Sequence, residues 1–288
     1  MSDYKSLKKI ALISAPGGVG KTTIVMLLAY LFRMRSKNVL VVDVDPSAGL
    51  SLYLMGEDEY QRRIERGKTL ANMIEKVIVK GEEIDVRDYT KEVMVLKRTF
   101  DLIPSSDELS DVIGKIWFGG QYGKPGEMLK KVFESIDLST YDIVIFDTIP
   151  FYERRYTTLS IYAADYYLVP LTPAKLDNIR TRRMLRKFRS IADEMGILES
   201  DFYSKFGIVY SKVDRVRHRD FKKGEGVPTA YKNAFLDISA SMKVFDNYIP
   251  FSKELEDLKN ISKLGKAEDD LINFFRELLE WIGEPLPY

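Results

Sequence analysis

The chain contains no cysteine and a single histidine among its 288 residues. The missing thiols exclude disulfides, thiolate zinc sites and iron–sulfur ligation, and this composition fits a reducing compartment. No run of about 18 apolar residues occurs, so the sequence predicts no membrane-spanning helix. Residues 1–9 are short and polar and do not have the apolar core of a signal peptide. We therefore expect a cytoplasmic protein without a membrane segment.

A strong net charge is also missing, because 44 Lys and Arg residues face 43 Asp and Glu residues, for a net charge of +1. Without a global field, binding to nucleic acid or to anionic lipid would have to come from local patches. Hydrophobic residues make up 45% and charged residues 30%, which is typical of a globular protein. The chain is long enough to bury a large core.

Short apolar runs alternate along the chain with stretches of helical periodicity. This alternation predicts an α/β fold, with a doubly wound, mostly parallel sheet and helices on both faces. The expected strands are residues 10–14, 39–44, 102–103, 143–146, 167–170 and 206–210, and the expected helices are residues 21–34, 125–135, 180–195 and 271–282. We expect a single domain over residues 1–288, with a charged helical excursion at about 56–100 and a glycine-rich loop at 118–126.

A glycine-rich segment lies between the first expected strand and the first expected helix. It runs Ala15-Pro16-Gly17-Gly18-Val19-Gly20-Lys21-Thr22-Thr23 and fits the A/G-x-x-x-x-G-K-[ST] form of a P-loop. In such a loop, backbone N–H groups face a phosphate, the lysine reaches the outer phosphates and the threonine ligates Mg²⁺. The alternative is a glycine-rich turn that binds nothing, but the coincidence of motif, strand and helix favours the phosphate site.

Carboxylates follow two of the other expected strands. Asp43 and Asp45 end the run at 39–44, and Asp147 ends the run at 143–146. Carboxylates at these strand ends can hold Mg²⁺ through water or orient an attacking water. A single Asp at such a position commonly caps the next helix instead. The presence of a P-loop in the same chain favours the functional interpretation.

These segments together resemble the ParA/MinD (Soj-like) group of P-loop ATPases. Gly17 to Thr23 is similar to their deviant Walker A motif, and Val39 to Pro46 to their switch I region. Asp147-Thr148-Ile149-Pro150 resembles their Walker B motif, in which the family has Asp-Thr-Pro-Pro. Further similarities at 102–109, 163–170 and 249–252 extend the resemblance over nearly the whole chain.

The resemblance implies the P-loop NTPase fold, ATP and Mg²⁺ as cofactors, and a role for each site residue. Lys21 would contact the β- and γ-phosphates, and Asp45 would position or activate the attacking water. Thr22, Asp45 and Asp147 would support the metal, with Asp43 close to switch I. Ser211 lies where the family places a segment that contacts the base. The nucleotide would be held by Gly17, Gly18, Val19, Gly20, Lys21, Thr22, Thr23 and Ser211.

One residue departs from the family pattern. ParA-type proteins carry a signature lysine before the paired glycines, which reaches across the dimer to the phosphates of the partner, whereas this chain has Pro16. Proline has neither a charge nor a backbone N–H. Either another cation takes its place, with Arg154, Arg155 and Lys175 as candidates, or hydrolysis is slow and the protein is mainly a binding switch. Ordinary surface charge is the alternative for these three cations.

Basic residues gather in two segments in the second half of the chain. Residues 180–189 contain no acid, and residues 212–223 contain six cations against two acids. Such stripes can follow DNA phosphates without reading bases, although solvated helix faces or loops have the same pattern. The DNA-binding candidates are Arg180, Arg182, Arg183, Arg186, Arg189, Arg215, Arg217 and Arg219, and the second segment also contains Lys212, Lys222 and Lys223.

Three functions are compatible with these patterns. The favoured one is an ATPase that forms a homodimer with ATP, binds DNA nonspecifically and partitions or positions it with a ParB-like or other centromere or adaptor protein. The second is a weakly hydrolysing, nucleotide-dependent switch that binds a protein. A MinD-like membrane role is disfavoured, because the expected helix at 271–282 is flanked by acids and would be repelled by anionic lipid. The third of the three functions is that of a P-loop kinase or synthetase.

Overall fold

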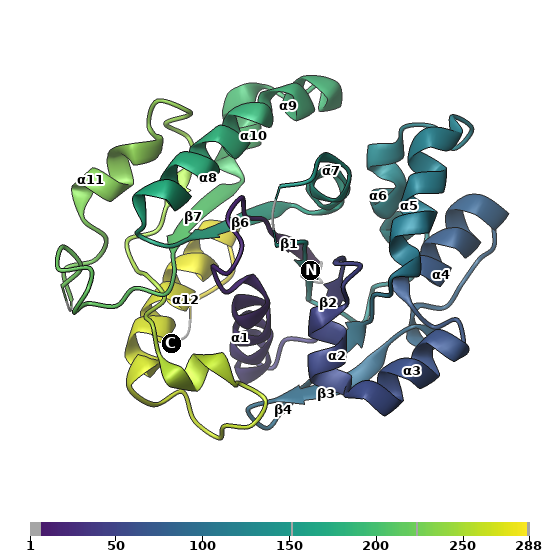
Figure 1. The fold of residues 1–288 in the computed structure, drawn as a ribbon, viewed down its shortest axis with the longest axis horizontal. Helices are drawn as coiled ribbons and strands as arrows, with labels where there is room; N and C mark the ends of the chain where they lie inside the picture. Colours follow the sequence, from purple (N-terminus) through teal and green to yellow (C-terminus); the bar gives the residue numbers. More distant parts are fainter. Residues whose placement is uncertain (1–6, 151, 223, 287–288) are drawn as a thin grey trace, which may run out of the picture. The chain divides into compact units, whose positions relative to one another are not determined.

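The computed structural model of the protein describes residues 7–150, 152–222 and 224–286. The fold is α/β, with an eight-stranded, mostly parallel sheet and helices (Figure 1), so the predicted fold class is confirmed. The described residues divide into two compact units. The first unit contains residues 7–11, 24–149 and 153–165, and the second contains residues 12–23, 150, 152 and 166–286.

The first unit has its strands in the spatial order β3-β4-β2-β5-β1. Strands β2 and β5 are parallel and buried at every residue, which is the burial expected for inner strands of a parallel sheet. Its strands are β1 (Lys8–Leu12), β2 (Val39–Asp43), β3 (Lys91–Val95), β4 (Arg98–Ile103) and β5 (Ile143–Asp147). Its helices are α2 (Gly49–Met55), α3 (Glu57–Glu65), α4 (Leu70–Ile74), α5 (Glu108–Gly119), α6 (Met128–Glu134), α7 (Arg154–Ala163) and all of α1 (Lys21–Met34) beyond its first three residues.

The charged excursion is only partly helical, which corrects the sequence prediction. It contains α3 and α4, a π-helix at Glu75–Lys80 and a 3-10 turn at Val86–Asp88. It then forms β3, which pairs antiparallel with β4. In β3 only Val93 and Val95 are buried, because successive side chains of this outermost strand point to opposite faces and Met94 between them is exposed. A 3-10 turn at Pro125–Glu127 begins the expected helix at 125–135, and α6 follows it.

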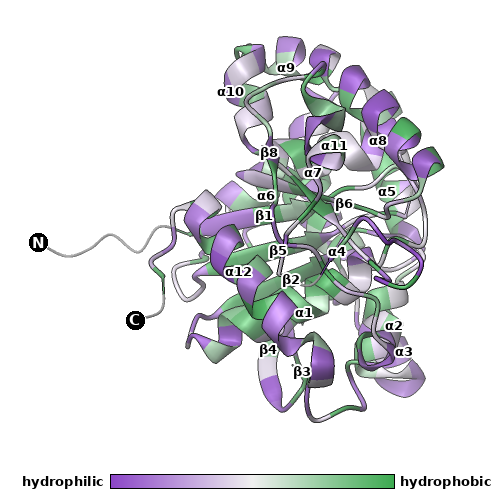
Figure 2. Ribbon diagram, turned by 90° about the vertical axis from the view of Figure 1, so that its left-hand side faces the viewer, coloured by the Kyte–Doolittle hydropathy of each residue, from purple (hydrophilic) through white to green (hydrophobic). Residues whose placement is uncertain are grey.

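The second unit contains the parallel strands β6 (Tyr166–Leu171), β7 (Phe206–Tyr210) and β8 (Lys243–Val244) in that order. Figure 1 shows α8 on one side of β6 and β7 and α12 on the other, and Figure 2 shows both helices alternating hydrophilic and hydrophobic residues. Its helices are α8 (Lys175–Lys187), α9 (Arg189–Met195), α10 (Glu199–Ser204), α11 (Thr229–Lys232) and α12 (Glu268–Ile282), with 3-10 turns at Asn233–Phe235, Lys253–Glu256 and Gly265–Ala267.

The helix expected at 180–195 begins earlier and is broken in two. It starts at Lys175 and ends at Lys187, and α9 begins at Arg189. Phe188 lies at the break and is fully buried, with its ring 5.7 Å from the ring of Phe206 on β7. The apolar spacing continues through Phe188, so the periodicity alone does not show the break.

Helix α12 is a docked core helix, as the sequence indicated. Its apolar residues Leu271, Phe274, Leu278 and Ile282 are fully buried. Glu277 is not one of its surface acids, because it is only 9% exposed. Its carboxylate accepts hydrogen bonds from the backbone N–H groups of Asp246 and Asn247, at 2.8–3.0 Å. Within the described part of the chain, no helix is long and apolar enough to cross a membrane.

Candidate nucleotide site

The loop between β1 and α1 adopts a conformation that requires two of its glycines. Gly18 has a φ of 74° and Gly20 a φ of 85°, a region that side-chain-bearing residues rarely adopt. Val19 between them is buried and anchors the loop, whereas Gly17 and Gly18 are exposed. Helix α1 begins directly at Lys21, so the positive end of its dipole lies at this loop. Exposed backbone at a helix N-terminus is the arrangement that a phosphate group needs.

The amine of Lys21 is held inside this loop. Lys21 is 5% exposed, and its Nζ donates a hydrogen bond to Ser14 Oγ at 2.8 Å. Ser14 is also buried, and its hydroxyl donates in turn to the carbonyl of Pro16 at 2.9 Å. This chain of contacts positions a buried cation among polar oxygen atoms, which phosphate oxygens can replace. The motif identified Lys21, but Ser14 was not predicted, because it precedes the motif.

The remaining motif residues, Thr22 and Thr23, lie in the first turn of α1. Both are half-buried. A threonine hydroxyl directly after the P-loop lysine suits Mg²⁺, which prefers oxygen ligands and keeps several waters. The predicted residues 17–23 are therefore brought together by the structure in one continuous loop and helix turn.

Ser211 and Lys212 support the loop from the end of β7. Ser211 is buried, and its Oγ donates to the carbonyl of Val19 at 2.8 Å. Lys212 follows with a φ of 51°, and its Cε lies 3.5 Å from where a Cβ on Gly20 would be. The structure thus places Ser211 as a brace behind the loop, and it places the cation of Lys212, which the sequence assigned to a basic segment, beside Gly20.

The three predicted acids lie in the first unit at the ends of two neighbouring strands. Asp43 and Asp147 are opposite each other in the register of β2 and β5, and both are buried. Asp43 accepts hydrogen bonds from Ser51 Oγ at 2.7 Å, from Ser51 N at 3.0 Å and from Asp45 N at 3.1 Å. Asp45 is half-buried and accepts from Ser47 N at 2.8 Å. Carboxylate oxygens suit Mg²⁺ chemically, but within the described residues no three acidic or histidine side chains are placed close enough to hold a metal ion by themselves.

The environment of Asp43 opposes ionisation. Burial raises its pKa, and the nearby Asp147 carboxylate raises it further, to about 8, against the lowering effect of the hydrogen bonds from Ser51 and Asp45. A bound cation would stabilise two carboxylates that lie this close together. Of the two acids at the end of β2, Asp43 is therefore the buried carboxylate and Asp45 is the more accessible one.

The first basic segment divides into paired and unpaired arginines. Arg182 and Arg186 both contact Asp237 Oδ2 at 2.6 Å, and Arg189 contacts Glu199 at 2.9 Å. Arg180 and Arg183 have no carboxylate partner within the described part of the chain, and both are exposed. The DNA-binding candidates Arg182, Arg186 and Arg189 are thus partly neutralised by these carboxylates.

The second basic segment is similar. Arg215 contacts Asp270 and also donates to Tyr248 Oη at 2.7 Å, and Arg217 lies 3.3 Å from Asp214. Arg219 is exposed, whereas Lys223 lies outside the described residues. His218 accepts the backbone N–H of Asp214 through Nδ1 at 3.0 Å, which gives the single histidine a structural role.

The candidate replacements for a signature lysine have different surroundings. Arg155 is held by Glu153, with Nε and Oε1 3.1 Å apart. Arg154 also has an interaction partner. Lys175 is exposed and lines a cavity with Arg182 and Tyr231. The structure brings three other cations, Arg180, Arg183 and Lys187 of α8, next to Ala15. The sequence assigned Arg180 and Arg183 to a DNA-binding segment and did not indicate that they lie beside the phosphate loop.

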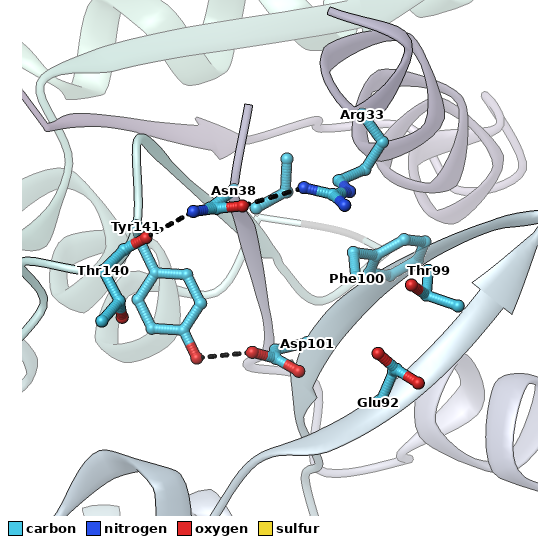
Figure 3. Close-up of a pocket in the computed structure, with 9 residues that line it drawn as sticks. Arg33, Asn38, Glu92, Thr99, Phe100, Asp101, Thr140 and Tyr141 are labelled. Atoms are coloured by element: carbon cyan, nitrogen blue, oxygen red, sulfur yellow. Dashed lines mark hydrogen bonds between the residues drawn. The ribbon is translucent and has the colours of Figure 1, made fainter. Parts of the chain in front are cut away.

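A further polar cavity of about 220 Å³ lies at the amino ends of β2 and β5, whereas Asp43 and Asp147 follow their carboxyl ends (Figure 3). Tyr141 Oη donates to Asp101 Oδ2 across it at 2.7 Å, and burial raises the pKa of Tyr141. Arg33 donates to Asn38 Oδ1 at 3.0 Å. One contact joins α1 to the residue before β2, and the other joins β4 to the segment before β5, so the cavity wall has a structural role.

A family model and several known proteins match the chain. The AAA_31 family model, described as an AAA domain, matches residues 7–199. An uncharacterised protein of Methanocaldococcus jannaschii is 26% identical over 278 residues, covering 96% of this chain and 98% of that protein. The maintenance of carboxysome distribution protein A of Synechococcus elongatus is 25% identical over 276 residues, covering 94% of this chain and 97% of that protein.

Solved structures share the fold over the whole chain. Apo McdA of Cyanothece has a TM-score of 0.70 at 22% identity and covers 95% of this chain and 100% of its own. The cobyrinic acid a,c-diamide synthase of Mycobacterium smegmatis, solved with an ATP analogue and magnesium, has a TM-score of 0.66 at 18% identity and covers 98% of this chain and 99% of its own.

Proposed function

Because the chain belongs to the AAA_31 family and is a P-loop ATPase of the ParA/MinD type, we propose that it binds ATP with Mg²⁺ and hydrolyses it to control its own association with DNA. The observation that carries the nucleotide part is the loop itself. Two left-handed glycines expose backbone at the start of α1, and the buried Lys21 amine lies within the same loop. A loop that bound nothing would not need a buried cation.

In this proposal each site residue has a defined task. Lys21 neutralises the outer phosphates, and residues 17–20 donate backbone N–H groups to them. Thr22, Asp45 and Asp147 hold Mg²⁺, which supplies charge neutralisation to the phosphates when bound. Asp45 orients the attacking water, since it is the more accessible of the two strand-end carboxylates in the Asp43–Asp45 pair. Ser211 keeps the loop in place through Val19.

The proposed cycle couples nucleotide to DNA. ATP favours a homodimer, the dimer binds DNA nonspecifically, and a ParB-like, centromere-binding or adaptor protein stimulates release. The protein would then be associated with the nucleoid or with a plasmid. The name of the Synechococcus relative refers to the distribution of carboxysomes, which supports a positioning role of the same general kind.

The ion pairs on α8 and α9 are compatible with DNA binding. The side chains of Arg182, Arg186 and Arg189 are 34%, 50% and 52% exposed in their pairs with Asp237 and Glu199. Exposed pairs contribute only about 0–1 kcal/mol each, so DNA phosphates can replace these carboxylates. Arg215, Arg217 and Arg219 would extend this surface.

A second candidate rests on Pro16. Its backbone carbonyl accepts from Ser14, and it has no charge to offer to a phosphate. If no other residue supplies that charge, hydrolysis is slow and the chain is a nucleotide-dependent switch that binds a protein.

The test measures ATP hydrolysis and binding to a random-sequence DNA duplex, at low and moderate salt, with ATP, with ADP and without nucleotide. Lys21→Ala should abolish both ATP turnover and ATP-dependent DNA binding, whereas Lys115→Ala, which removes an exposed lysine of α5, should change neither. Reversal of the charges of Arg182, Arg186 and Arg189 to Glu should abolish DNA binding and leave ATP binding intact.

Each outcome separates the two candidates. ATP-dependent binding that weakens steeply with salt supports the DNA-positioning proposal, because each released counterion adds to the salt dependence. ATP binding without DNA binding in any state would contradict it and favour the protein-binding switch.

A further inference from the structure

Helix α8 carries its cations on two different faces. Arg182 and Arg186 lie one turn apart, and both contact Asp237. Arg180, Arg183 and Lys187 are spaced by three and four residues, so they share a second face. Among the described residues, none of these three has a carboxylate partner. We refer to Arg180, Arg183 and Lys187 as the unpaired α8 cations.

The unpaired α8 cations line a cavity together with the first residue of the phosphate loop. The cavity has a volume of about 270 Å³ and is lined by Ala15, Tyr152, Arg180, Arg183, Met184 and Lys187. It therefore contains three cations and no acid. All of these residues belong to the second unit, which also contains the loop up to Thr23.

Tyr152 gives one wall of the cavity a defined position. Its ring lies 5.9 Å from the ring of Phe188, which is fully buried, and Lys187 Nζ lies 5.0 Å from the centre of the Tyr152 ring. A cation–π contact of this kind holds the amine near the ring without neutralising its charge. Lys187 is also stabilised by the C-terminal end of the α8 dipole. Arg180 and Arg183 have no comparable stabilisation.

Like charges at these spacings are unfavourable on their own. Cations three or four residues apart on a helix destabilise it by a few tenths of a kcal/mol per pair, and each pair becomes favourable once an anion lies between its members. The other face of α8 has such an anion in Asp237. The face toward Ala15 contains the same type of residues without an anion, which is what a site for a bound anion needs.

We propose that the unpaired α8 cations bind the terminal phosphate of a nucleoside triphosphate and supply the positive charge that Pro16 cannot. This inference rests on the proposed function, because it needs a nucleotide in the phosphate loop. Arginine favours phosphate because its planar guanidinium donates two parallel hydrogen bonds. Arg180 and Arg183 are the principal ligands, and Lys187 adds charge. The phosphate comes either from the nucleotide of the same chain or from that of a second copy.

The test compares the affinities of the protein for ATP and for ADP by titration calorimetry with Mg²⁺. In an Arg180→Ala/Arg183→Ala variant, ATP affinity should fall about tenfold or more, while ADP affinity changes less than about threefold, because only ATP has the terminal phosphate. The matched control, Arg182→Ala/Arg186→Ala, removes the same charge from the other face of α8 and should keep the ratio of the two affinities. Arg180→Lys/Arg183→Lys should restore part of the preference for ATP.

An equimolar mixture of Lys21→Ala and Arg180→Ala/Arg183→Ala chains distinguishes the two sources of the phosphate. If the cations act on the nucleotide of a second copy, the Lys21→Ala chain supplies them, and tight ATP binding returns in the mixture. If they act within one chain, the mixture keeps the weak ATP binding of the double variant. Both results support the proposal and differ only in which chain holds the nucleotide.

Three results would overturn the proposal. An unchanged preference for ATP in the folded double variant would remove these cations from nucleotide binding. Loss of DNA binding with an unchanged preference for ATP would assign the cavity to a nucleic-acid backbone. If the unaltered protein bound neither ATP nor ADP, the proposed function would fail, and this inference would fail with it. If the unaltered protein binds both nucleotides but the double variant keeps its preference for ATP, only this inference fails.

Discussion

Replacement of Glu277 by alanine is expected to lower the free energy of unfolding by about 3 kcal/mol. The carboxylate of Glu277 lies on α12 and holds the chain directly after β8. Its oxygens accept from Asp246 N at 2.8 and 3.0 Å, from Asn247 N at 2.9 Å and from Asn247 Nδ2 at 3.0 Å. Lys243 Nζ lies 2.6 Å from Oε1.

The magnitude follows from the groups that the substitution leaves without a partner. Two backbone N–H groups lose their acceptor, at about 1 kcal/mol each where water can partly replace it. The ion pair with Lys243, whose side chain is 34% exposed, contributes up to about 1 kcal/mol. For a chain of this size, a loss of about 3 kcal/mol lowers Tm by about 5 °C. Glu277→Gln keeps one acceptor and the side-chain volume, so it should lose about half as much.

Chemical denaturation of each variant measures these differences, with Glu280→Ala as the control. Glu280 is exposed on the same helix, and its replacement should change the free energy of unfolding by less than about 0.5 kcal/mol. A Glu277→Ala protein as stable as the unaltered one would refute the assignment of Glu277 as the group that fixes residues 246–247. An equal loss in Glu280→Ala would refute it as well, because the effect would then belong to the helix in general.

Three further predictions concern the loop and the excursion. Gly20→Ala should cost about 1–2 kcal/mol of stability and weaken ATP binding, because its φ of 85° is unfavourable for alanine although the added Cβ meets only an ordinary contact with Lys212. Thermal unfolding with and without ATP measures it, and an unaffected protein would contradict it. Lys212→Gly should keep stability or raise it by up to about 1 kcal/mol, because glycine tolerates the φ of 51° at this position. The same variant should weaken ATP binding if the Lys212 side chain contributes to the nucleotide site. Unchanged ATP affinity would show that Lys212 does not contribute to nucleotide binding. Hydrogen bonds from Arg62 and then from Lys91 lower the pKa of Glu59 to about 2, so its stabilisation is present above its ordinary pKa of 4.5 and is lost as pH falls toward 2. Glu59→Gln should therefore be less stable by up to about 1 kcal/mol at pH 7, and denaturation across pH 2–7 should show the difference closing at the acid end.

Local patterns were sufficient for the loop and for the buried strands. Gly17 to Thr23 form one continuous motif in the sequence, so the motif alone predicts the loop and the start of α1 at Lys21. The strands β2 and β5 are apolar at every inner residue and end in the predicted acids. The register that places Asp43 opposite Asp147 follows once both strands are parallel neighbours.

Features that depend on distant segments were not predictable. Strand β3 was missed because only Val93 and Val95 are buried in a charged stretch, a pattern too short to outweigh helix-forming neighbours. Ser211 contacts Val19, which lies 192 residues earlier in the sequence, and the cavity beside Ala15 is lined by residues of α8. No local pattern encodes such proximity. The ion pairs of Arg182 and Arg186 with Asp237 have the same origin.

The two outermost strands limit how copies of this protein can associate. Strand β8 has only two residues, and β3 carries Lys91 and Glu92 next to a short apolar alternation. An outermost strand exposes unpaired backbone groups that another chain can extend into a continuous sheet, and short or charged strands prevent this. Strand addition and fibril-like stacking are therefore disfavoured at both ends. The dimer proposed above would therefore form through side-chain surfaces and not through backbone pairing.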